Sequence, residues 1–150
     1  MTDYRKNTTP LCGNTREKAM KIIHVDMNKY ARYAMEMDIP QILPNAELHC
    51  FPAPDHALAF AKEHGCDVLM TEVELWTERL GGFRLAKAMK ELNPQVKIIF
   101  VTVWSKTEIS RELSWLQISG FIPKPWSLET LAGMFGKLYC MFDPQTMSRS

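Results

Sequence analysis

Short apolar runs and amphipathic stretches alternate five times along this chain, and this alternation constrains its fold more than any other feature. The apolar runs cover residues 22–25, 48–51, 96–101 and 120–123, and a further run lies within residues 66–75, where it ends in two carboxylates. Runs of this length suit strands buried on both faces, and strands that alternate with helices form a parallel sheet. We therefore expect an α/β fold with a parallel five-stranded sheet and helices on both faces. The arrangement that we adopt is the flavodoxin-like (βα)5 three-layer sandwich with the strand order 2-1-3-4-5, which the alternation permits but does not by itself select.

Residues that begin or end helices bound the amphipathic stretches. Pro40 should end or confine the first helix, which we expect from about residue 28 to 37. Pro54 and Gly65 bound the second helix. A third helix should begin at residue 82 with an inward stripe at 85, 89 and 92. Ser105 and Glu108 have the spacing of a capping box, which predicts a fourth helix to about residue 118. The last helix should follow residue 127, with positions 128, 131, 132, 135 and 138 inward.

The length and composition indicate one soluble domain. The chain has 150 residues, of which 46% are hydrophobic and 23% charged, and this is enough for one substantial core. We expect a flexible leader at residues 1–19, a folded domain at 20–140 and a C-terminal tail at 141–150.

Charge and cysteine usage argue against several classes of function. The net charge of +1 does not suggest direct nucleic-acid binding. No apolar run approaches the roughly 20 residues that span a bilayer, so we expect no membrane association and a cytoplasmic location. The four cysteines form no C-x-x-C pair, which favours reduced thiols over zinc ligands. His24 lies within an apolar run and is expected to be a hydrogen-bonded core residue.

Polar residues follow four of the five predicted strands. Asp26 follows the first, Glu72 and Glu74 the third, Thr102 the fourth and Lys124 the fifth. The carboxyl ends of parallel strands lie at one edge of the sheet, and ligands bind there at the point where the strand order reverses. We therefore expect Asp26 and Glu72 to meet at this edge, with Glu72 and Glu74 as the first candidates for chemistry or signalling.

At these positions the chain resembles the receiver domain of two-component response regulators, over about residues 20 to 138. Segments 67–74, 85–94 and 98–102 look most like receivers of LytTR-type regulators. The resemblance implies a CheY-like pocket with Asp26, Thr102, Lys124 and a cis Pro125. It also implies that Phe121 is the aromatic switch residue.

Two positions depart from that family. The phosphoacceptor position is occupied by Glu72, and the second acid of the metal pair is replaced by Met27. Mg²⁺ requires close oxygen ligands in near-octahedral geometry, and a thioether is a poor substitute. We expect no other cofactor and at most a weakened Mg²⁺ site at Asp26, Glu72 and Glu74. Ordinary phosphotransfer should therefore be lost or very weak.

These features predict a degenerate pseudo-receiver, not an enzyme, that acts in signal transduction by phosphorylation-independent protein–protein interaction. Its partner would be a histidine kinase or an output protein, bound through the fourth helix, fifth strand and fifth helix; a homodimer through the fourth and fifth helices is also left open. One alternative is a functional phosphoacceptor in a histidine-kinase phosphorelay that regulates transcription through a separate output protein. Another is a small flavodoxin-like ligand-binding protein. We expect no direct control of transcription by this chain, because the DNA-binding domain of LytTR-type regulators has no counterpart within these residues.

Overall fold

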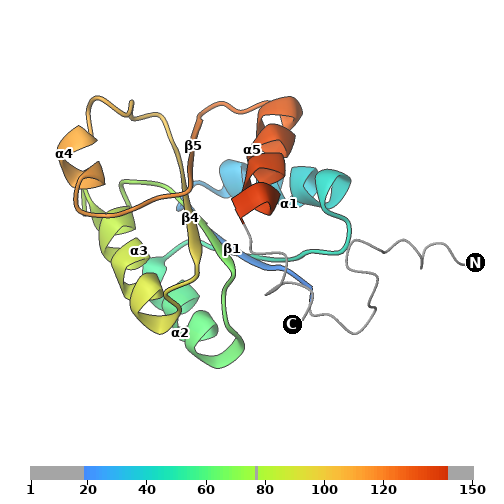
Figure 1. Cartoon of the computed structure of the whole chain (residues 1–150), viewed down its shortest axis with the longest axis horizontal. Coiled ribbons are helices and arrows are strands. Elements are labelled where there is room, and N and C mark those ends of the chain that lie inside the picture. The colour runs from blue at the N-terminus through green and yellow to red at the C-terminus, as the bar shows by residue number, and fades with distance from the viewer. Residues whose placement is uncertain (1–18, 77, 142–150) are drawn as a thin grey trace, which may run out of the picture.

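The computed structural model describes residues 19–76 and 78–141, and it contains the expected parallel sheet (Figure 1). The strands are β1 (Lys21–Val25), β2 (Glu47–Phe51), β3 (Val68–Thr71), β4 (Lys97–Thr102) and β5 (Gly120–Pro123). They pair in the order β2-β1-β3-β4-β5, and every pairing is parallel. The predicted fold class and strand order are confirmed.

Helices cover both faces of this sheet. They are α1 (Lys29–Ile42), α2 (Pro54–His64), α3 (Gly81–Leu92), α4 (Ser110–Leu113) and α5 (Leu128–Met141). Figure 1 shows α2 and α3 on one side of the sheet and α1 and α5 on the other. Each side has its own apolar core, because successive side chains of a strand point to opposite faces.

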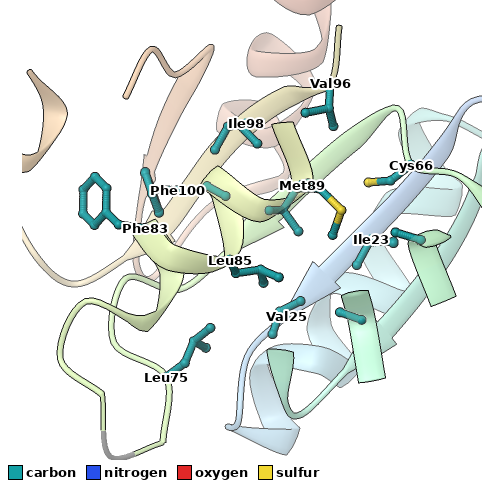
Figure 2. Packing of buried hydrophobic residues seen from close by; sticks show 14 of the residues in the cluster. Ile23, Val25, Cys66, Leu75, Phe83, Leu85, Met89, Val96, Ile98 and Phe100 are labelled. Atoms are coloured by element: carbon teal, nitrogen blue, oxygen red, sulfur yellow. The ribbon is translucent and has the colours of Figure 1, made fainter. Parts of the chain in front are cut away.

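Strand β1 illustrates this alternation. Ile23 and Val25 belong to the core that packs beneath α2 and α3, where Leu85 and Met89 meet them (Figure 2). Ile22, one residue earlier, belongs to the opposite core beneath α1 and α5. The continuous apolar run in β1 therefore supplies both layers, as a strand buried on both faces must.

The first helix is longer than predicted. It continues through Pro40 to Ile42, whereas the sequence suggested an end near residue 37. Proline removes one backbone donor and costs most in a helix interior. Here Pro40 lies in the last turn, and the neighbouring Ile39 is fully packed in the core. Burial of that side chain outweighs the lost hydrogen bond. At the other end, the Asn28 side chain accepts from the N–H groups of Tyr30 and Ala31 and caps the helix.

The fourth helix is much shorter than predicted. The capping-box contacts form, since Ser105 N donates to Glu108 Oε1 and Glu108 N donates to Ser105 Oγ. The α-helix nevertheless covers only Ser110–Leu113. Ile109 is fully buried while Leu113 and Leu116 are only half-buried. One well-packed side chain does not provide the continuous apolar stripe that stabilises a long helix.

Three expected core residues face solvent. Leu92, Leu128 and Ala132 are exposed, so the inward stripes predicted for the third and fifth helices are too wide. Most of the expected leader and the tail after residue 141 lie outside the described residues. None of the described helices is long and apolar enough to cross a membrane.

Candidate functional site

Three charged side chains meet at the carboxyl end of the sheet. Lys124 Nζ donates to Asp26 Oδ2 at 2.5 Å and to Glu72 Oε1 at 2.8 Å. Both carboxylates are buried, with relative exposures of 2% for Asp26 and 9% for Glu72. The structure thus gathers three of the residues singled out in the sequence, from strands that are far apart along the chain.

Backbone pairing places these side chains. Strands β1 and β3 pair Val25 with Thr71, and the next N–H, that of Glu72, donates to Val25 O at 3.1 Å. Asp26 and Glu72 therefore leave the sheet side by side. Lys124 N donates to Thr102 O at 2.9 Å, which holds the end of β5 beside the end of β4. The Lys124–Pro125 peptide bond is cis.

Every carboxylate oxygen of this site has a hydrogen-bond donor. Asp26 Oδ1 accepts from Asn28 N at 2.9 Å, and Glu72 Oε2 accepts from Val73 N at 2.8 Å. The remaining oxygen of each carboxylate accepts from Lys124. Burial opposes the charge on the Lys124 ammonium, but the hydrogen bonds to the two carboxylates outweigh it and raise the pKa of Lys124 above its usual value. The lysine is therefore charged at neutral pH.

Met27 lies outside this cluster and contacts the loop after β3. Its side chain is partly exposed, and its Sδ atom accepts from Trp76 N at 3.2 Å. The Trp76 indole Nε1 donates to Pro52 O at 2.8 Å. Trp76 has a left-handed backbone (φ 56°), which costs a non-glycine residue about 1–3 kcal/mol. The loop thus holds apolar side chains where the family resemblance implies a second acid.

The remaining predicted site residues differ in their burial and in their contacts. Thr102 is fully buried, and its Oγ1 accepts from Trp104 N at 3.2 Å. Phe121 is half-buried and packs against the core beneath α2 and α3. Glu74 is exposed. Among the described residues, no group of three or more His, Cys, Asp or Glu side chains could hold a metal ion.

His24 is buried as expected but differs from the expectation in its hydrogen bonding. It is fully buried, as expected, but neither ring nitrogen has a hydrogen-bond partner among the described residues. The expected hydrogen bond is therefore wrong. Burial lowers the pKa of His24 to about 4, so the imidazole is neutral at pH 7. No local pattern distinguishes this arrangement from a satisfied core histidine, because it depends on what α1 and the neighbouring strands bring to the same face.

A family model and solved structures agree on what this chain resembles. The model described as the response regulator receiver domain matches residues 22–135. No curated protein matches the chain. The chemotaxis protein CheY4 of Vibrio cholerae is similar in fold, with a TM-score of 0.71 and 21% identity over 80% of this chain and 98% of that one.

Two further structures extend the comparison. A CheY-like receiver domain protein from Methanospirillum hungatei JF-1 has a TM-score of 0.72 and 17% identity over 83% of this chain and 96% of that one. The response regulator DrrB of Thermotoga maritima, described as an OmpR/PhoB homolog, has a TM-score of 0.69 and 19% identity over 83% of this chain. The match covers only 54% of DrrB.

Proposed function

Because this chain belongs to the response regulator receiver domain family of two-component signalling, we propose that it is a receiver that signals without being phosphorylated. The observation that carries the proposal is the ion cluster at the sheet edge. The ammonium of Lys124 already bridges Asp26 and Glu72 at 2.5 and 2.8 Å. Receivers are generally signalling domains without an enzymatic activity directed at another substrate, and we propose the same for this one.

Glu72 is a poor phosphoacceptor in this setting. It occupies the position that the family resemblance assigns to the phosphoacceptor, but with one additional methylene. Its Oε1 accepts from Lys124 and its Oε2 accepts from Val73 N. Attack on a phosphodonor requires an oxygen placed within a fraction of an ångström, and a displacement of about 1 Å costs on the order of a hundredfold in rate. Glu72 instead supplies a permanent negative charge beside Lys124.

The residues present do not fit the Mg²⁺ ion that the family implies. Mg²⁺ takes oxygen ligands at close to octahedral positions. The donor set here comprises the carboxylates of Asp26 and Glu72, both already bonded to Lys124, and the thioether of Met27, which is bonded to Trp76 N. Sulfur is a soft ligand that Mg²⁺ does not prefer. We therefore derive no phosphotransfer step through this metal.

A protein partner follows from the same proposal. Receiver domains interact with kinases and output proteins, and this chain presents exposed apolar side chains near α4, β5 and α5. Trp115 and Val103 are both exposed there. Aromatic side chains are enriched in protein interfaces. We propose that this face contacts the partner. We also propose a particular likeness to LytTR-type receivers, which the resemblance of segments 67–74, 85–94 and 98–102 supports.

Intact-mass spectrometry after incubation with acetyl phosphate and Mg²⁺ tests the proposal. The natural chain should gain no phosphoryl mass, whereas a Met27→Asp, Glu72→Asp double variant restores the family's donor set and should gain one. A Met27→Asp, Glu72→Asp, Lys124→Met triple variant serves as a matched control that keeps the acids and removes the ammonium.

The alternative is a true phosphoacceptor in a relay. A phosphoryl group on the natural chain would establish it and overturn our proposal, and peptide mapping would then identify the modified acid. The partner face is tested separately in a two-hybrid panel of histidine kinases and output proteins. Trp115→Ser should abolish a positive interaction there, while Leu92→Ser, at an exposed apolar site on α3, should leave it unchanged.

A further inference from the structure

Helix α1 has an apolar stripe on its solvent side. Tyr30, Tyr33 and Met37 have relative exposures of 70%, 57% and 70%. They follow the spacing i, i+3, i+7, so they form one line along the helix. The opposite side of α1 is anchored in the core by Met35 and Ile39. The helix is therefore apolar on two opposite sides, and the described part of the chain covers only one of them.

Two further exposed apolar residues lie near the start of α1. Met27 directly precedes the residue that caps the helix, and the backbone N–H of Trp76 donates a hydrogen bond to the Met27 sulfur. Both side chains are exposed. Large exposed apolar groups are individually unremarkable, but a continuous line of them marks an interaction surface.

Two opposite charges lie along one flank of the stripe. Lys29 and Glu36 are both exposed, and neither forms an ion pair with another described residue. They are seven residues apart, which is close to two helical turns, so they lie on the same side of α1. The flank is basic at the N-terminal end of the helix and acidic towards its C-terminal end.

We propose that α1 pairs with α1 of a second copy of this chain, antiparallel and about a twofold axis. In the register where Tyr30 faces Tyr33 of the other copy, Lys29 lies beside Glu36 of the other copy. The twofold symmetry repeats both contacts. Charged residues that flank an apolar seam between paired helices set the orientation of the helices in this way.

The order of the charges along the flank favours a second copy of this chain as the partner. A rotation by 180° exchanges the positive and negative ends of the flank, so this surface is complementary to itself. The proposed seam lies on α1, whereas the face assigned above to a heterologous partner is formed by α4, β5 and α5. The inference does not depend on whether Glu72 is phosphorylated, so it can fail without affecting the proposed function.

Sedimentation equilibrium of the full chain over micromolar to millimolar concentrations tests the proposal. The natural chain should show a monomer–dimer equilibrium. Lys29→Glu and Glu36→Lys should each weaken dimerisation about tenfold, because each replaces two attractive contacts by two repulsive ones. The combined Lys29→Glu, Glu36→Lys variant should restore the natural dimerisation constant. Lys87→Glu, Glu91→Lys on the exposed side of α3 is the matched control and should have no effect.

Tyr33→Ser removes part of the seam and should make the chain monomeric, with an unchanged circular dichroism spectrum as evidence that the variant is folded. A natural chain that is monomeric throughout the concentration range would overturn the proposal. So would a dimer that is indifferent to Tyr33→Ser, or one that the double charge exchange does not restore. The last result would indicate that the stripe binds a different protein or a different register.

Discussion

Lys124 Nζ lies 2.8 Å from Glu72 Oε1, although 52 residues separate the two side chains in the sequence. The same nitrogen contacts the buried carboxylate of Asp26. One cation therefore neutralises part of a buried pair of acids, and removal of this cation leaves two carboxylates close together in a poorly hydrated site. This arrangement links the stability of the domain to the residues of its candidate site.

Lys124→Met should lower the free energy of unfolding by about 3 kcal/mol at pH 7, because breaking a buried ion pair leaves uncompensated charge. Urea denaturation followed by tryptophan fluorescence measures the change. Lys87→Met, at an exposed site on α3, is the control and should change the stability by no more than about 0.5 kcal/mol. Equal effects of the two substitutions would show that the cluster contributes nothing specific.

Added Mg²⁺ should not change the melting temperature of the natural chain, since its donor set includes a thioether. The Met27→Asp, Glu72→Asp variant should be stabilised instead. At a metal concentration ten times the dissociation constant, the gain is about 1.4 kcal/mol, a shift of several degrees. Differential scanning calorimetry measures both, with NaCl at equal ionic strength as the control. A comparable Mg²⁺ shift in the natural chain would contradict our account of Met27.

Stability should fall as the pH is lowered from about 6.5 to 4, because of His24. Burial lowers the pKa of its imidazole from 6.5 to about 4 in the folded chain. Between these values the unfolded chain binds a proton that the folded chain does not, so protonation favours unfolding. The full effect is on the order of 3 kcal/mol.

His24→Val isolates this contribution, because valine suits a buried strand and does not titrate. The difference in unfolding free energy between the natural chain and the variant should change sharply between pH 6.5 and 4 and be flat above pH 7. A pH-independent difference would mean that His24 is partnered or hydrated in solution.

Gly82→Ala should destabilise the domain by about 1–3 kcal/mol through overpacking. A Cβ atom at this position would lie 2.1 Å from Glu72 O, a backbone atom that cannot rotate away. Gly133→Ala is the matched control in α5, where a Cβ atom meets nothing within 4 Å. It should stabilise the domain by up to about 1 kcal/mol. Thermal unfolding of the two variants should therefore shift in opposite directions.

The length of each helix shows how local signals and packing compete. Pro54 and Gly65 bound α2 as the sequence predicted. Proline has a fixed φ that suits the first turn of a helix, and glycine readily adopts the positive φ of 90° found at the end of α2. Pro40 did not end α1, and the capping box at Ser105 did not lead to a long α4. In both cases the outcome depended on how well the following side chains are buried, which a local pattern does not contain.

The sequence alone determined the alternation of elements and the positions of Asp26, Glu72 and Lys124 at the ends of strands, since apolar periodicity is a local property. The strand order was an expectation that the pairing of distant strands confirmed. Only the tertiary structure decided that Lys124 bridges both acids and that His24 has no hydrogen-bond partner among the described residues. These facts depend on distances of a few ångströms between side chains from different strands. The packing of the whole sheet sets such distances, so no single segment of the chain encodes them.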